Sequence, residues 1–134
     1  MTIEQIKKRE WLSRVKTVYK QFKNLQRQIE KDQRQKKFLS EISVSDDVLT
    51  KKIESDIQQQ GKQIKELIAL HEEIKKAILT VHDDILEIIL IRYYLLYESF
   101  PKIAKKMNYT PMHIQRLFYQ AIDEIIIPEV EEIA

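Results

Sequence analysis

A single glycine, Gly61, in a chain of 134 residues is the sequence feature that most restricts the fold. Tight turns and hairpin loops depend on glycine and proline, and the chain has only three prolines besides that glycine. Lys, Glu, Gln, Ile and Leu are abundant instead, which is typical of long helices rather than sheets. The hydrophobic share of 43% is enough for a packed core. We therefore predict an all-α protein.

Residues 1–80 have the pattern of a long antiparallel helical hairpin that resembles a coiled coil. A first helix from Thr2 to about Phe38 carries apolar residues at alternating steps of four and three, namely Trp11, Val15, Val18, Phe22, Leu25 and Ile29. Residues 40–47 contain loop and capping residues, and Ser45 or Asp46 should start the second helix. The seam predicted for that helix is Leu49, Ile53, Ile57, Gln60, Ile64, Leu67, His71, Ile74 and Ile78.

Three positions in the second helix interrupt its apolar pattern. Gln60 and His71 are polar members of the seam, where such residues can fix register and oligomeric state. For His71 a metal or pH-switch role is the alternative, although no second ligand stands at helical spacing. Gly61 is expected to bend or split the helix.

The apolar stripe of the first helix is wider than one partner helix usually covers. It includes Trp11, Leu12, Val15, Val18, Tyr19 and Phe22. We expect the surplus to meet another chain, which makes residues 1–80 the interface of a homodimer or higher homo-oligomer. The alternative is a monomeric bundle in which a third helix covers the stripe.

Charge is distributed unevenly along the chain. Residues 1–38 carry 12 basic and 4 acidic side chains, whereas residues 123–134 carry 5 acidic side chains and no basic one. The basic stretch is either a solvated helix face or a contact surface for DNA phosphates or an acidic partner.

A third helix is predicted to start at Asp83 or Asp84, because carboxylates suit a helix N-terminus. It is apolar on nearly every side, and we expect it to be buried on more than one face through Ile85, Leu86, Ile88, Ile89, Ile91, Tyr93 and Leu96. Arg92 is interpreted either as a support residue that bonds within its own domain or as a phosphate contact. Beyond the last helix, which Pro128 should stop, Ile125, Ile126 and Ile127 form an apolar cluster that must pack, with a second subunit as one candidate.

Residues 99–121 predict a helix-turn-helix. Ser99 followed by Pro101 is a helix start signal, and Asn108 readily takes the left-handed conformation that ends a helix sharply. Thr110 and Pro111 repeat the start signal two residues later. A small residue at position 104 allows close crossing of the two helices, and the inner face of the second helix is Ile114, Leu117, Phe118 and Ala121.

The outer face of the second of these helices, residues 111–126, carries the predicted DNA site. In a helix-turn-helix this face lies in the major groove, so the predicted base contacts are Met112, His113, Gln115, Arg116 and Tyr119. Arginine pairs with guanine and glutamine with adenine through two hydrogen bonds. The predicted phosphate contacts are Lys102, Lys105, Lys106 and Thr110. The competing interpretation is a compact helical hairpin with a solvated basic face.

The last third of the chain resembles the helix-turn-helix of sigma-factor domain four. The resemblance is carried by Arg92-Tyr93 through Phe100, Ile103-Ala104, Tyr109, Ile114, Arg116-Leu117 and Ala121. In particular, the stretch is similar to the small ArpU-like transcriptional regulators of phages and prophages in Gram-positive bacteria. The resemblance implies transcription control, or at least DNA binding, and makes RNA polymerase a partner to test. Two residues depart from the family pattern, Phe100 where tryptophan is common and Phe118 where histidine is frequent.

Enzyme motifs are missing from the sequence: it has no glycine-rich phosphate loop, no His-Glu metal motif and no strained serine elbow. We expect no enzymatic activity, no cofactor, no metal and, without a signal peptide or a membrane span, a cytoplasmic location in a bacterial host. The leading hypothesis is a sequence-specific DNA-binding regulator with a hairpin at 1–80 and a DNA-binding domain at 81–134. The alternatives are a DNA-binding packaging protein that resembles a small terminase subunit and a coiled-coil protein–protein adaptor.

Overall fold

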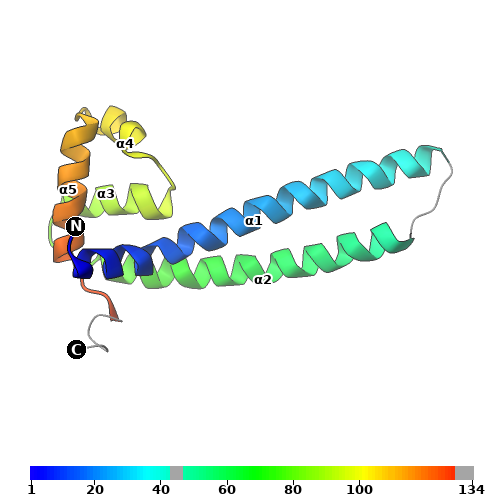
Figure 1. The fold of residues 1–134 in the computed structure, drawn as a ribbon, viewed down its shortest axis with the longest axis horizontal. Helices are drawn as coiled ribbons and strands as arrows, with labels where there is room; N and C mark the ends of the chain where they lie inside the picture. The colour runs from blue at the N-terminus through cyan, green and yellow to red at the C-terminus, as the bar shows by residue number, and fades with distance from the viewer. Residues whose placement is uncertain (43–46, 129–134) are drawn as a thin grey trace. The chain divides into compact units, whose positions relative to one another are not determined.

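The computed structural model describes residues 1–42 and 47–128, and within these ranges all regular elements are helical. The elements are α1 (Ile3–Glu41), α2 (Asp47–Ile78), α3 (Asp84–Leu90), the π-helical segment η1 (Ile91–Leu95), α4 (Phe100–Met107) and α5 (Pro111–Glu124), as Figure 1 shows. The all-α prediction is confirmed, and α1 packs on α2 as predicted. The predicted start of the second helix at Ser45 or Asp46 lies outside the described residues.

The chain forms two compact units, and both long helices run through both of them. The first, which we call the core unit, consists of Met1–Lys16 and the described residues from Ala69 onward. The second, the hairpin unit, is Thr17–Ile68. The core unit therefore combines the start of α1 and the end of α2 with all of α3, η1, α4 and α5.

The start of α1 is closed by a capping box. The Thr2 hydroxyl accepts a hydrogen bond from the Gln5 backbone N–H at 3.1 Å, and the Gln5 side chain accepts one from the Thr2 N–H at 2.9 Å. This reciprocal pair satisfies two backbone donors that the first turn of a helix leaves free. It fixes the first turn of α1 in the core unit.

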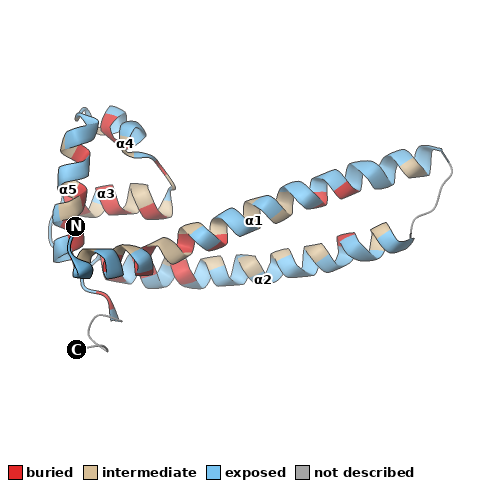
Figure 2. Cartoon of the chain, viewed as in Figure 1, coloured by how far each residue is buried: buried red, intermediate tan, exposed pale blue. Residues whose placement is uncertain are grey.

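The core unit buries most of its apolar side chains (Figure 2). Trp11, Leu12 and Val15 are at most 2% exposed, so their part of the α1 stripe is covered within the chain. The expectation that these residues meet a second subunit is therefore wrong. The physical reason is that the core unit surrounds the start of α1 with several elements, whereas helical periodicity alone indicates a single partner helix.

The apolar cluster after α5 also packs within the core unit. Ile125 and Ile127 are each 1% exposed, whereas Ile126 between them points outward and is 52% exposed. The Ile126 N–H donates to the Thr80 hydroxyl at 2.9 Å, which ties this segment to the end of α2. No second subunit is needed to cover the cluster, and α5 ends at Glu124, four residues before Pro128.

The third predicted helix is shorter and less buried than its sequence suggests. Asp83 caps it by accepting the Leu86 N–H at 3.0 Å, as predicted. Leu86, Ile89 and Leu90 are buried, but Ile85 and Ile88 are each 42% exposed. The expectation of burial on more than one face is wrong, because α3 ends after seven residues and continues as η1, which redirects the following side chains.

In the hairpin unit, the face of α2 turned inward differs from the predicted seam. The side chains at least half-buried along it are Leu49, Ile53, Asp56, Gln60, Gln63 and Leu67. Two predicted seam residues, Ile57 and Ile64, are 47% and 41% exposed. Lys52 explains part of the shift, since it bonds both Asp32 of α1 and Asp56, which draws the polar side of α2 toward α1. Helix α2 passes through Gly61 without a break, so the expected split does not occur.

Candidate functional site

Capping residues at the ends of α4 and α5 build the turn between these two helices. The Ser99 hydroxyl accepts the Lys102 N–H at 3.4 Å to start α4, and Asn108 ends it in the left-handed conformation at φ 59°. The N–H groups of Asn108 and Tyr109 both reach the carbonyl oxygen of Ala104, the latter at 2.9 Å. These contacts satisfy the last carbonyls of α4 and reverse the chain within two residues. The predicted caps are confirmed.

Thr110 then starts α5. Its hydroxyl accepts the His113 N–H at 3.1 Å, and Pro111 occupies the first turn, where no N–H partner is missing. Ile103 and Ala104 of α4 and Ile114 of α5 are at most 1% exposed. The two helices therefore hold one another through small and branched side chains.

An aromatic cluster packs against the buried face of α5. The Phe118 ring lies 4.8 Å from Tyr93, 5.0 Å from Phe100 and 5.9 Å from Tyr94, measured between ring centroids. Tyr93 and Phe100 are stacked at 4.8 Å. The fully buried Phe118 and the half-buried Phe100 thus contact each other. Their role is packing, which fixes the rotation of α5 about its axis.

Three of the predicted base-contact residues project into solvent from α5. Met112 is 80% exposed, and Gln115 and Arg116 are both exposed. His113 is half-buried, with its ring 4.8 Å from Tyr109 in an edge-to-face arrangement. The Arg116 guanidinium contacts His113 Nδ1. Met112, His113, Gln115 and Arg116 therefore form one surface on the first half of α5, which we call the α5 face.

Tyr119, the fifth predicted base contact, is held by α1 instead. Its hydroxyl accepts a hydrogen bond from Arg9 Nη1 at 3.2 Å, and the Arg9 guanidinium lies 5.6 Å from its ring centroid. The side chain is half-buried. The structure thus assigns Tyr119 a contact between α5 and α1 that sequence analysis did not predict.

The predicted phosphate contacts fall into two kinds. Lys102 and Lys105 are exposed, and in residues 1–42 and 47–128 no carboxylate pairs with either of them. Lys106 pairs with Glu98 at 2.7 Å while its own side chain stays 46% exposed. Thr110 is exposed, but its hydroxyl already serves as the cap of α5.

Glu98 is the most informative residue that sequence analysis missed. Its side chain is only 3% exposed and accepts hydrogen bonds from Lys106 Nζ at 2.7 Å and Arg92 Nη1 at 2.8 Å. The bonds from Lys106 and then Arg92 hold the pKa of the Glu98 carboxyl below its usual range. Arg92 is therefore a support residue within the core unit, which decides between its two interpretations. Opposite charges six and eight positions apart were the available signal, but the turn at 96–99 that brings them together has no regular period.

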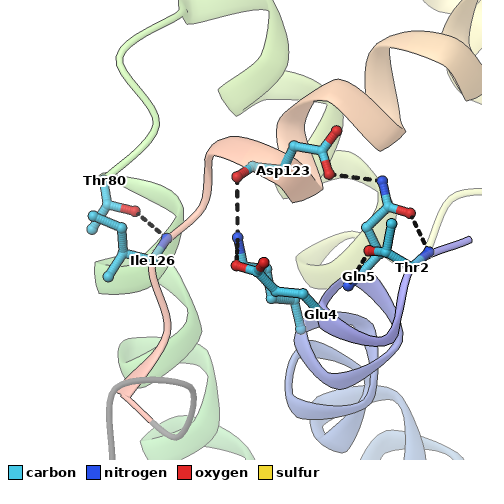
Figure 3. Close-up of polar contacts among 7 residues, drawn as sticks. Thr2, Glu4, Gln5, Thr80, Asp123 and Ile126 are labelled. Atoms are coloured by element: carbon cyan, nitrogen blue, oxygen red, sulfur yellow. Dashed lines mark hydrogen bonds and ion pairs between the residues drawn. The ribbon is translucent and has the colours of Figure 1, made fainter. Parts of the chain in front are cut away.

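The start of α1 also anchors the C-terminal end of α5 (Figure 3). Gln5 Nε2 donates to Asp123 Oδ1 at 2.7 Å, and Lys8 Nζ donates to the Asp123 carbonyl oxygen at 3.1 Å. Lys8 is only 5% exposed and also pairs with Glu4 at 3.4 Å. A cation at the end of a helix complements its dipole and its unpaired carbonyls. Part of the basic charge of residues 1–38 thus stabilises the core unit.

Two further contacts tie the long helices to the aromatic cluster and its flanking turn. Lys16 Nζ lies 3.2 Å from the Tyr93 ring centroid, and burial, together with the nearby Arg9 charge, lowers the pKa of Lys16 to about 8. His71 Nε2 and the Tyr97 hydroxyl form a 2.7 Å hydrogen bond, and burial lowers the pKa of His71. Tyr97 has a left-handed backbone at φ 57°. His71 therefore has a structural partner, consistent with a satisfied histidine.

Comparison with protein-family models, curated proteins and solved structures gives no match. The α5 face must therefore be interpreted from its own chemistry. In the described part of the chain, no group of three or more His, Cys, Asp or Glu side chains is placed to hold a metal ion. None of the helices described is both long and apolar enough to span a membrane.

Proposed function

We propose that the chain is a DNA-binding protein that inserts the α5 face into the major groove, acting as a transcriptional regulator of the phage type. The observation that carries the proposal is that α5 has one buried apolar face and one exposed polar face. Ile114, Phe118 and Ala121 are fully buried, whereas Met112, Gln115 and Arg116 are exposed and take no part in core packing. A buried stripe with an exposed polar face behind a tight turn is what a reading helix requires.

The chemistry of the α5 face suits base edges. Arg116 carries the donors that pair with O6 and N7 of guanine, and Gln115 carries the donor and acceptor that pair with adenine. His113, in contact with Arg116, orients its guanidinium, and Met112 supplies an apolar contact for a thymine methyl group. Met112 and Gln115 are exposed and take no part in core packing, so their side chains can adapt to DNA, whereas His113 packs on Tyr109 and holds Arg116.

Helix α4 supplies the matching backbone contacts. Lys102 and Lys105 are exposed cations without a carboxylate partner in the described ranges, and such cations bind phosphates without regard to sequence. Lys106 is held by the buried Glu98 and so serves mainly to fix α4 against the turn before it. We therefore assign phosphate binding to Lys102 and Lys105 ahead of Lys106.

The experiment is selection of DNA fragments by the full chain from the genome of its host or phage, followed by affinity measurements on the enriched sequence. Arg116→Ala should lose about 1–3 kcal/mol of discrimination at one base position. Lys105→Ala should weaken enriched and random DNA alike, because it contacts phosphate only. Uniform loss with both variants, or no DNA affinity at low salt, would count against direct readout by the α5 face.

A promoter-reporter assay then separates regulation from packaging. A regulator changes reporter output from a promoter that contains the enriched site, and Arg116→Ala reduces the change. A packaging protein binds the same DNA without altering transcription. A protein–protein adaptor enriches no DNA at all, and RNA polymerase is tested as a partner by co-purification with the regulator.

A further inference from the structure

Helix α2 of the hairpin unit carries an apolar stripe that nothing in the described chain covers. Ile57, Ile64 and Ile68 are 47%, 41% and 62% exposed, and Gly61 lies between them. These positions follow one another at steps of four, three and four, so they share one face of the helix. We call them the α2 stripe. It lies roughly a quarter turn around α2 from the face that meets α1, at 3.6 residues per turn.

The only glycine of the chain stands in the middle of this stripe without an internal reason. A Cβ built on Gly61 meets nothing within 4 Å, so no neighbouring group in the described chain requires its small size. Glycine within a helix is less favourable than alanine, because it loses more backbone freedom on folding. A position that has this cost and no contact inside the chain is explained when another backbone or side chain approaches it from outside.

The hairpin unit also lacks a complete core of its own. Among its described residues only the apolar side chains of Val18, Ile29 and Ile53 are buried. Beside the half-buried Leu49 and Leu67, its inner face also holds the polar residues Asp32, Asp56, Gln60 and Gln63. Two helices that bury so little apolar surface gain little from packing on each other, and coiled coils and bundles add further helices to supply the rest.

From these observations we infer that the α2 stripe pairs antiparallel with the same stripe of a second copy of this chain. In that arrangement Ile57 faces Ile68 of the second copy, and Gly61 faces its Ile64, so the side chain of each Ile64 fills the space above a glycine. A parallel arrangement sets Gly61 against Gly61 and leaves a gap, which close-packed helix interfaces avoid. The self-matching spacing is why the occupant is a second copy rather than an unrelated helix.

The inference does not depend on DNA binding, and it moves the interface away from the α1 residues that the sequence favoured. Its first test is the mass of the full chain by light scattering at micromolar concentration. We expect twice 16.1 kDa for the native chain and for Val48→Glu, a control on the same helix whose side chain is 79% exposed and lies off the stripe. Ile64→Glu places an unpaired charge in the interface and should weaken association by on the order of a hundredfold.

A second variant separates association from folding. Gly61→Leu increases helix propensity, so it should not unfold α2, yet its side chain occupies the space that Ile64 of the second copy needs. We expect a monomer with an unchanged helical circular dichroism spectrum. A Gly61→Leu chain that stays dimeric, or a native chain that is monomeric at every concentration, overturns the inference.

Disulfide crosslinking tests the orientation directly, since the chain has no cysteine of its own. An equimolar mixture of Ile57→Cys and Ile68→Cys chains should form the mixed disulfide dimer, because these positions face each other. Ile57→Cys alone should crosslink poorly, since its two copies are about 16 Å apart along the paired helices at ~1.5 Å per residue. Efficient crosslinking of Ile57→Cys with itself overturns the antiparallel arrangement.

Discussion

The core unit buries twenty apolar side chains among its described residues, whereas the hairpin unit buries three, although α1 and α2 run through both units. In the core unit, α3, η1, α4 and α5 enclose the ends of the long helices and exclude water from several sides. In the hairpin unit each helix has one neighbour and the inner face contains carboxylates and amides. The difference teaches that helix length does not measure stability, because a helix gains most of its stability from the elements that cover it.

A substitution in the aromatic cluster should show the largest difference in stability between the two units. Phe118→Ala removes a fully buried ring that contacts Tyr93, Tyr94 and Phe100, and should lower the free energy of unfolding of the core unit by about 3–5 kcal/mol. Leu25→Ala, at a half-buried position of the hairpin unit, should cost only about 1 kcal/mol. Trp11 is the only tryptophan and lies in the core unit, so its fluorescence during urea unfolding reports that unit alone.

Circular dichroism in the same titration reports the helices of both units. We expect the dichroism to fall at lower urea than the fluorescence of Trp11 changes, because the hairpin unit opens first. Coincident transitions, or equal losses from Phe118→Ala and Leu25→Ala, would contradict the proposed difference between the units.

Acid should affect each unit through a different carboxylate, with a smaller effect than the loss of Phe118. Hydrogen bonds from Lys106 and Arg92 lower the pKa of Glu98 in the core unit, and the bond from Lys52 lowers the pKa of Asp32 in the hairpin unit. A carboxylate with a lowered pKa stabilises the fold above its ordinary pKa, 4.5 for Glu98 and 3.8 for Asp32, and this contribution is lost as the pH falls further.

Glu98→Gln should therefore flatten the acid dependence measured by Trp11 fluorescence and leave that of the hairpin helices in place. Asp32→Asn should do the reverse, with its effect seen by circular dichroism. Denaturation curves at pH 7, 5 and 3 for the two variants distinguish these outcomes. An acid dependence that both substitutions leave intact would show that other carboxylates control it.

Alkali gives the smallest of these effects and concerns the core unit only. Burial lowers the pKa of Lys16 from 10.5 to about 8, so between these values the unfolded chain binds more protons than the folded one and stability rises with pH. Since Lys16 is only half-buried, we expect a gain of only about 1 kcal/mol between pH 7 and 9.5. Lys16→Met removes the titrating group and should abolish this gain in urea unfolding followed by Trp11 fluorescence. A gain that persists in Lys16→Met would assign it to another group.

The sequence predicted correctly the helix ends that local capping residues specify. The caps at Thr2, Asp83, Ser99 and Thr110 and the left-handed Asn108 depend on residues within one turn, and the structure has each of them. The choice between adjacent faces of a helix is not local. The apolar pattern of α2 favours Ile57 and Ile64 as the inward pair, yet Asp56 and Gln63 on the adjacent face are the pair that turns inward. Only the position of α1 decides between these two faces.

Helical periodicity predicted which residues of α5 face solvent, but it could not predict the contacts that α4 and α5 make with distant parts of the chain. Met112, Gln115 and Arg116 lie outward because the opposite face of α5 is apolar, which the sequence displays directly. Tyr119 and Lys106 depend on partners 110 and 8 positions away, namely Arg9 and Glu98. Contacts of this kind follow from tertiary packing and have no signal in the periodicity of either helix.

The most direct test of the central proposal is the salt dependence of DNA affinity, measured by fluorescence anisotropy with a short duplex that carries the enriched site. Lys102→Ala combined with Lys105→Ala removes two exposed cations of α4, and Lys36→Ala combined with Lys37→Ala removes two exposed cations of the hairpin unit as a charge-matched control. If α4 and α5 bind DNA, the α4 pair should reduce the slope of log affinity against log salt by about 2, since each phosphate contact contributes ~0.9, while the control pair leaves it unchanged. Equal slopes for the two double variants would contradict the proposal that the core unit is the part of the chain that holds DNA.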